Sequence, residues 1–268
     1  MKSMLLFVIL ISITLVAKAG TMGLPNKWVG LYAGGNTGAA WGLLTNHLSI
    51  TNNSLNPLFY PPVIPGINKA GSSSLNPLRA TVGGQVGFNH ELKNNLLTGL
   101  EFSYHYVNLS QTLNQTSSFS NSPVVHFYSI KNVASATQMA TFRPRLGYHS
   151  DSYLIYITGG GAAANIKYNQ TFTDHQFSLA YATSLNAVRY GGVLGGGLEY
   201  FPFQALSFKI DYLYANFGST SISNQFSGTE SMAGLSATVK NSLDNITIQT
   251  LLFGINWHFA LRVRDENK

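Results

Sequence analysis

The chain has 268 residues, of which 45% are hydrophobic and 10% are charged, and its formal net charge is +6. This mild positive excess gives no reason to expect a nucleic acid partner. The sequence has no cysteine, which excludes disulfide bonds, thiolate metal sites and a lipid anchor attached to cysteine.

The N-terminus has the organisation of a secretion signal. Lys2 supplies a positive charge, residues 4–16 are apolar, and Ala17-Lys18-Ala19 forms a small-x-small cleavage site. The apolar run is shorter than the ~20 residues that a membrane-spanning helix needs. We therefore expect residues 1–19 to be a cleaved signal peptide and residues 20–268 to form a single domain.

Downstream of the signal, segments with the alternation of β-strands recur. In the clearest of them, Leu100, Phe102 and Tyr104 alternate with Glu101 and His105, which gives one apolar face and one polar face. Each segment is long enough for the ~9–11 tilted residues that cross a bilayer. The predicted strands are residues 28–42, 78–89, 95–109, 135–148, 153–168, 187–200, 205–217 and 246–259.

The connections between these strands alternate in length. Long loops are expected at residues 43–77, 110–134, 169–186 and 218–245, and short turns at residues 90–94, 149–152 and 201–204. Barrels of the outer membrane have long loops outside the cell and tight turns in the periplasm. The pattern therefore predicts an all-β fold, an eight-stranded antiparallel up-and-down transmembrane β-barrel with both ends in the periplasm.

Charged residues keep to one face of most predicted strands. In the fourth strand, Ala136 and Phe142 would face lipid, while Thr137, Arg143 and Arg145 would face the lumen. The fifth strand is apolar on both faces, so the alternation assigns it no inward side. The predicted interior charges are Glu101, Arg143, Arg145, Glu199, Lys209 and Asp211.

These interior charges admit two interpretations. An eight-stranded barrel has an interior just wide enough for its own side chains. The favoured interpretation is therefore a plug of salt bridges, in which opposite charges on neighbouring strands compensate one another. The alternative is a gated polar pore.

Several motifs resemble those of the small outer-membrane β-barrel family of Gram-negative bacteria. The motifs Gly83-Gly-Gln-Val-Gly-Phe-Asn, Arg143-Pro-Arg-Leu-Gly-Tyr and Lys209-Ile-Asp-Tyr-Leu-Tyr carry this resemblance, which extends over the strands from Trp28 to Phe259. The family includes opacity-type surface antigens, "porin family" barrels and the OmpA-type transmembrane domain. The resemblance implies insertion into the cell outer membrane after secretion to the periplasm.

The C-terminal segment is similar to the assembly signal of this family. Gly254, Trp257 and Phe259 match its glycine and its two outward aromatic residues. The resemblance implies recognition by the barrel-assembly machinery. The chain departs from the pattern at Leu252, where a polar residue is usual, and in the residues that follow Phe259.

The function that we expect is structural and surface interaction, like that of an adhesin or antigen, through the long loops. The resemblance implies outer-membrane lipids, lipopolysaccharide and host surface molecules as partners, and we expect no cofactor, metal site or catalytic residue. One alternative is a narrow porin-like pore for small solutes. Another is a lipid-modifying enzyme, for which His105 near Ser103 or His126 near Ser129 would be candidates. Aromatic residues that could form a carbohydrate-binding platform in the loops are Phe59, Tyr60, Phe119, Phe127 and Tyr128.

Overall fold

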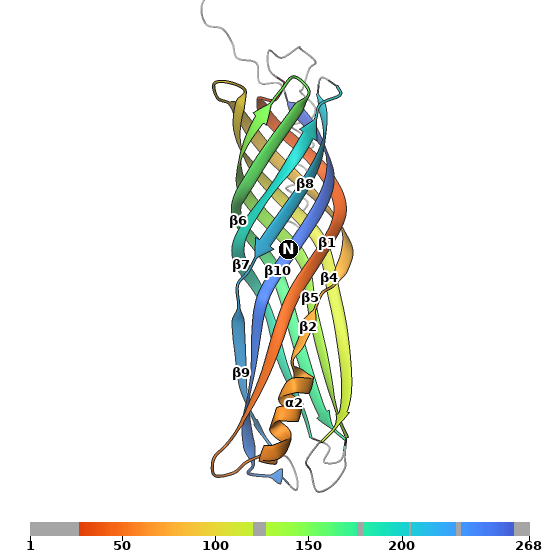
Figure 1. Ribbon diagram of the computed structural model, residues 1–268, viewed down its shortest axis with the longest axis vertical. Coiled ribbons are helices and arrows are strands. Elements are labelled where there is room, and N and C mark those ends of the chain that lie inside the picture. The colour runs from red at the N-terminus through yellow and green to blue at the C-terminus, as the bar shows by residue number, and fades with distance from the viewer. Residues whose placement is uncertain (1–26, 120–126, 176–178, 204, 229–231, 260–268) are drawn as a thin grey trace, which may run out of the picture.

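The computed structural model describes residues 27–119, 127–175, 179–203, 205–228 and 232–259, and nearly all of them form one antiparallel sheet (Figure 1). The expected signal peptide and the residues after Phe259 lie outside this part. The long strands are β1 (Gly30–Asn52), β3 (Leu78–Glu91), β4 (Leu96–Ser118), β5 (Phe127–His149), β6 (Tyr153–Asp174), β7 (Ala180–Tyr200), β8 (Leu206–Asn216) and β10 (Ser236–Phe259). The shorter elements are β2 (Ser73–Leu75), β9 (Thr220–Ser227), the 3-10 helix η1 (Pro61–Val63) and the helix α2 (Ile64–Gly71).

The eight long strands form a closed ring. Neighbours in the order β1-β3-β4-β5-β6-β7-β8-β10 pair antiparallel, and β10 returns to pair with β1, from Leu31 opposite Phe259 to Asn52 opposite Ala237. The predicted eight-stranded up-and-down barrel is confirmed. Within the described residues, no helix has both the length and the apolar character needed to cross a membrane.

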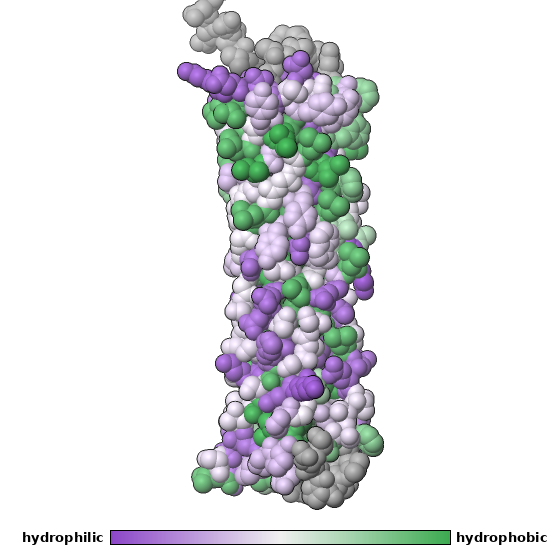
Figure 2. Space-filling view, in the orientation of Figure 1, coloured by the Kyte–Doolittle hydropathy of each residue, from purple (hydrophilic) through white to green (hydrophobic). Residues whose placement is uncertain are grey.

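An apolar belt surrounds the half of the barrel that carries the short turns. Each strand of the ring contributes exposed apolar side chains, which gather mainly in the upper part of the view in Figure 2. A belt of this kind is stable against lipid and unfavourable against water. It therefore marks the part of the barrel that crosses the membrane. One member from each strand, in ring order, is Leu31, Val86, Leu100, Phe142, Ile157, Leu198, Ile210 and Phe253.

The expectation of four long loops was wrong in most of its residues. Strands β1, β4, β5, β6, β7 and β10 continue beyond the belt. The residues left between strands at the outer end are 53–72, 76–77, 119–126, 175–179, 217–219 and 228–235. Outside the membrane the outward side chains become polar, as with Asn108 and Ser110 after the exposed Tyr106. A sequence search that requires an apolar outward face therefore ends each strand at the membrane border.

Bulges interrupt three strands near that border. They lie at Tyr106/Leu109 in β4, at Ala136/Met139 in β5 and opposite Leu43/Thr45 in β10. A bulge adds a residue to one strand, and in β5 and β10 this changes whether odd- or even-numbered residues face inward. This explains a second error, because Ala136 was expected to face lipid and is buried inside.

Beyond the belt the ring separates into two sheets. The β3–β4 ladder ends at Val82 opposite Tyr106, and the β7–β8 ladder ends at Gly192 opposite Asn216. The outer parts of β4, β5, β6 and β7 then face a second sheet of β9, β10, β1 and β2. Helix α2 lies at this outer end (Figure 1). We call this two-sheet region the outer body.

Candidate functional site in the barrel interior

A buried charged cluster occupies the lumen within the apolar belt. It comes from four strands, which point these side chains inward because inward and outward residues alternate. Each side chain is at most 3% exposed, and three positive charges balance three negative charges. The six residues, which we call the charged cluster, are Glu101, Arg143, Arg145, Glu199, Lys209 and Asp211.

Glu101 is the centre of the ion pairs in this cluster. Arg143, on the neighbouring strand, is hydrogen-bonded to it. Lys209 Nζ lies 2.9 Å from Glu101 Oε2 and 2.8 Å from Asp211 Oδ2. Arg145 Nη1 lies 3.7 Å from Glu101 Oε2 and 3.5 Å from Glu199 Oε2, so it connects the two glutamates. Such compensation is what buried charges need.

Neutral side chains complete the network, and the sequence analysis did not identify them as members of it. The Tyr32 hydroxyl donates a hydrogen bond to Glu101 Oε2 at 2.8 Å, and the Tyr156 hydroxyl donates one to Asp211. Asn256 Nδ2 donates to Glu199 Oε1 at 2.8 Å, and Arg145 Nε donates to an Asn89 amide oxygen at 2.8 Å. The alternation of β3 places Asn89 on the inward face, and this signal could have identified it as a member of the network. Tyrosine gives none, because it also populates membrane interfaces.

Two glycines make room for this network. A Cβ atom on Gly197 would lie 2.3 Å from Asp211 Oδ1, and one on Gly99 would lie 2.5 Å from Asn89 Oδ1. Both distances are too short for any side chain. The glycine-rich composition of these strands therefore serves the packing of the interior.

Within the described ranges, two serine–histidine pairs lie in the lumen, and neither has the geometry of a hydrolase. His105 Nε2 is 2.9 Å from Ser103 Oγ, and its Nδ1 has no hydrogen-bond partner among the described residues. His258 Nε2 contacts both Ser207 Oγ and Glu199, and no partner for its Nδ1 lies in the part of the chain that the structure describes. In a catalytic triad the acid binds the second ring nitrogen and orients the base. All four side chains are buried, and the candidate His126 lies outside the described residues.

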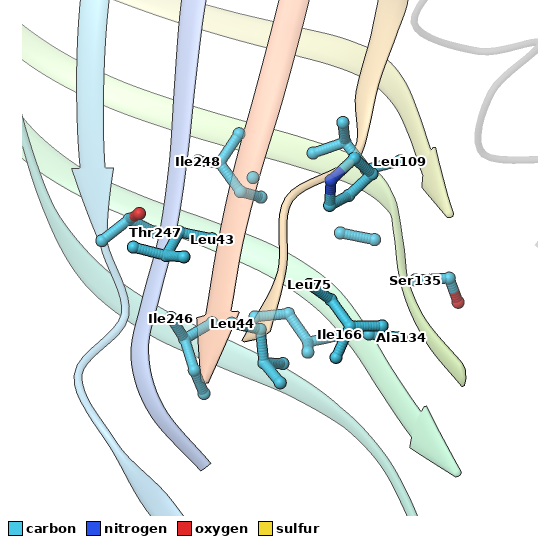
Figure 3. Close-up of a pocket in the computed structure, with 13 residues that line it drawn as sticks. Leu43, Leu44, Leu75, Leu109, Ala134, Ser135, Ile166, Ile246, Thr247 and Ile248 are labelled. Atoms are coloured by element: carbon cyan, nitrogen blue, oxygen red, sulfur yellow. The ribbon is translucent and has the colours of Figure 1, made fainter. Parts of the chain in front are cut away.

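An apolar layer fills the lumen next to the charged cluster, on the side toward the outer end of the barrel. Its buried members include Val107, Leu109, Met139 and Leu213. Figure 3 shows a small pocket in this layer, between side chains of β1, β2, β4, β5, β6 and β10. The pocket has a volume of about 40 Å³.

The next layer toward the outer end of the lumen consists of amide side chains that are hydrogen-bonded to helix α2. Asn46, Asn132 and Gln170 donate hydrogen bonds to the Gly71 carbonyl at the end of α2, at 2.9, 3.4 and 2.9 Å. Tyr168 donates to Asn132 Oδ1 at 3.0 Å. These groups lie outside the belt, and burial raises the pKa of the Tyr168 phenol above its usual value.

Beyond the amides, a second apolar cluster closes the outer end of the lumen. It includes Phe59, Phe119 and Tyr128, three of the five residues expected in a carbohydrate platform. These three are buried in contact with other side chains, so the platform interpretation was wrong for them. Tyr60 and Phe127 are exposed.

The three residues of the expected assembly signal lie at the periplasmic end of β10. Trp257 faces outward and is half exposed, and Phe259, two residues later, lies on the same face of β10. Gly254 faces inward, where a Cβ atom would lie 3.0 Å from Lys209 Cγ. The glycine thus leaves space for the stem of a lysine in the charged cluster.

An eight-stranded antiparallel barrel with an exposed apolar belt is the architecture of outer-membrane β-barrel proteins, and the fold of this chain belongs to that class. No protein-family profile matches the chain, and no curated protein matches it in sequence.

Solved structures with a similar fold have low sequence identity to this chain. Ail, the attachment invasion locus protein of Yersinia pestis, is 12% identical, with 84% of this chain and 99% of Ail covered and a TM-score of 0.32. The outer membrane protein OprG from Pseudomonas aeruginosa is 12% identical, with 87% and 98% covered and a TM-score of 0.40. The outer membrane protease OmpT from Escherichia coli is 8% identical, with 90% and 99% covered and a TM-score of 0.39. Similarity at this level says nothing about function.

Proposed function

We propose that the protein is an outer-membrane surface protein whose role is carried by its outer body, through structural support and contact with molecules outside the cell. The observation that carries the proposal is the length of the strands. They extend well past the apolar belt and build a region with its own apolar core, which crossing the membrane does not require.

The exterior of the outer body supports a contact role. Its outward side chains are mostly hydroxyls and amides, such as Thr112 and Asn114, and they offer donors and acceptors to polar partners. Three exposed lysines, Lys131, Lys167 and Lys240, add positive charge above the belt. This chemistry suits lipopolysaccharide and acidic surface glycans. An adhesin-like or antigen-like role is therefore the proposal.

The proposal has consequences for assembly. Residues 1–19 would be removed as a signal peptide, and residues 20–268 would form the barrel domain. Gly254, Trp257 and Phe259 would be read by the barrel-assembly machinery, and the belt would contact outer-membrane lipids.

The interior argues against the two alternatives. A pore needs a continuous polar path, whereas the charged cluster, the apolar layer and the amide layer succeed one another along the lumen. A lipid-modifying enzyme needs an accessible nucleophile, whereas Ser103 and Ser207 are buried. No catalytic role is part of the proposal.

The test is a barrel without its outer body. Each outer hairpin is cut at a paired position near the belt and closed with an Asn-Gly turn, which suits two-residue hairpins. The residues replaced are 42–77, 110–135, 167–186 and 217–246.

We expect the shortened barrel to fold, as measured by the migration of unboiled protein on a gel, because the paired strands of the belt remain. Cells that display it should lose binding to host surfaces and to antisera raised against the intact protein. The matched control is Asn94→Gly in a periplasmic turn, where the φ of 62° suits glycine. Unchanged binding by the shortened barrel would refute the proposal.

A further inference from the structure

The wall of the barrel has a seam between β3 and β4 where the apolar belt ends. The β1–β3 ladder stops at Trp41 opposite Leu78, and the β3–β4 ladder stops at Val82 opposite Tyr106. Pro77 lies between β2 and β3 and has no N–H to offer a neighbouring strand. A side-chain contact bridges the seam, because Asn76 N donates to Gln111 Oε1 at 2.7 Å.

Two cavities meet at this seam. On the outside lies a groove of about 520 Å³, lined by polar residues that include Asn76, Arg79, Ser110 and Gln111. On the inside lies the apolar pocket of Figure 3, lined by residues such as Leu44, Leu75, Leu109 and Ile166. Pro77 lines both cavities. The polar groove and the apolar pocket therefore meet at Pro77.

Arg79 gives the groove a positive charge. Its side chain is exposed, and its guanidinium donates to the carbonyls of Leu78 and Ser110 at 2.8 and 3.1 Å. Those two bonds fix the guanidinium in place and leave N–H groups for a further acceptor. Among the described residues, no carboxylate lies within ion-pair distance of Arg79. A held and uncompensated arginine is suited to a carboxylate or phosphate.

The groove is also within reach of the lipid. Leu78 and Val82, on the outward face of β3 beside it, are 60% and 57% exposed. The apolar pocket is small, since an engineered cavity of ~150 Å³ holds one benzene molecule. A pocket of about 40 Å³ accommodates the end of an alkyl chain and not a compact ring.

We propose that the seam binds a single-chain anionic amphiphile of the fatty-acid type. The carboxylate pairs with Arg79 in the groove, and the chain passes Pro77 so that its end lies in the apolar pocket. The outer leaflet of the membrane supplies the ligand. This inference is independent of the proposed surface role.

Gly42 offers a way to block the passage. A Cβ atom on Gly42 would lie 3.3 Å from Leu109 Cδ1 and 3.6 Å from Pro77 Cγ, so an added side chain would take up space in the pocket beside Pro77. Gly161 provides the matched control, because a Cβ atom there meets nothing within 4 Å. Lys131, exposed on the outer face of β5, is the matched control for Arg79.

The experiment uses the full-length mature protein in phosphatidylcholine nanodiscs and dodecanoic acid with a photoreactive diazirine at its chain end. After illumination, mass spectrometry locates the labelled residues. We expect labels on pocket residues such as Leu75, Leu109 and Ile166. Arg79→Gln should weaken this labelling by about tenfold, the scale of one lost charge-assisted hydrogen bond. Gly42→Val should abolish it, while Gly161→Val and Lys131→Gln should label like the unmodified protein.

Two further arms keep the test decisive. If Gly42→Val does not fold, Gly42→Ala replaces it and should reduce the labelling of the pocket. The uncharged alcohol with the same chain should label the pocket about as weakly as the acid labels Arg79→Gln. Labels confined to lipid-facing residues such as Val82 and Tyr106, or pocket labelling that neither Arg79→Gln nor the Gly42 variant reduces, would overturn the proposal.

Discussion

Lys209 and Glu101 form an ion pair across the full width of the barrel. Their strands, β8 and β4, are separated by three strands in either direction around the ring, yet Lys209 Nζ lies 2.9 Å from Glu101 Oε2. The contact lies inside the apolar belt, where the barrel crosses the membrane. It therefore connects opposite walls at the level where a pore would have to be open.

Removing the lysine of this pair should destabilise the barrel. Lys209→Met would leave Asp211 without a positive partner and Glu101 with its two arginines. Removing one partner of a buried ion pair costs about 3–5 kcal/mol. Urea titration of the protein folded into lipid vesicles measures the loss. The control, Lys240→Met on the exposed face of β10, should change the free energy of unfolding by less than about 1 kcal/mol. Equal stability of the two variants would show that the cross-lumen pair contributes nothing.

The border of the apolar belt can be located with one substitution at two sites on the same face of β4. Leu100→Arg places a charge against lipid and should cost ~2–4 kcal/mol if it lies near the bilayer midplane. Thr112→Arg places the same charge on the exposed outer body and should cost little. Folded yield in lipid vesicles, read from the gel migration of unboiled protein, compares the two. Similar yields would mean that the belt is not where we place it.

Helix α2 should loosen when its contact with β1 is crowded. In Gly71→Ala the new Cβ atom would lie 2.1 Å from Leu48 Cδ2 and 3.1 Å from Leu48 Cβ, so Leu48 or the helix has to move. Overpacking of this kind costs about 1–3 kcal/mol, and movement of the helix would strain three amide hydrogen bonds to the Gly71 carbonyl. Hydrogen exchange of residues 64–72 should become faster.

The control for this effect is Lys69→Ala, which changes an exposed side chain of the same helix. Its exchange rates should stay close to those of the unmodified protein. If both variants exchange alike, Gly71 does not position the helix.

Within the belt, alternation alone was enough to predict the strands and the direction of their charges. Glu101 and Arg143 share inward parity on adjacent strands, and the structure pairs them directly. The contact between Glu101 and Lys209 could not be read in the same way, because it depends on which strands lie opposite one another. Tyr156 was missed because β6 is apolar on both faces, so its sequence gives no parity signal.

The outer body was missed for a different physical reason. In the belt the outward face is apolar, whereas beyond it the inward face is apolar, as with buried Ile130 beside exposed Lys131. Bulges at the border also change which residues of β5 and β10 face inward, from even to odd numbers in β5 and from odd to even numbers in β10. A sequence search that looks for strands with an apolar outward face therefore assigns strands with an apolar inward face to loops.

The most direct test of a barrel closed at its centre is the conductance of the unmodified protein in a planar lipid bilayer. The charged cluster, the apolar layer and the amide layer together predict no steady single-channel current, even when gel migration shows that the inserted protein is folded. A large and stable ion current from the folded protein would contradict the closed lumen and would favour a pore as the function of the barrel.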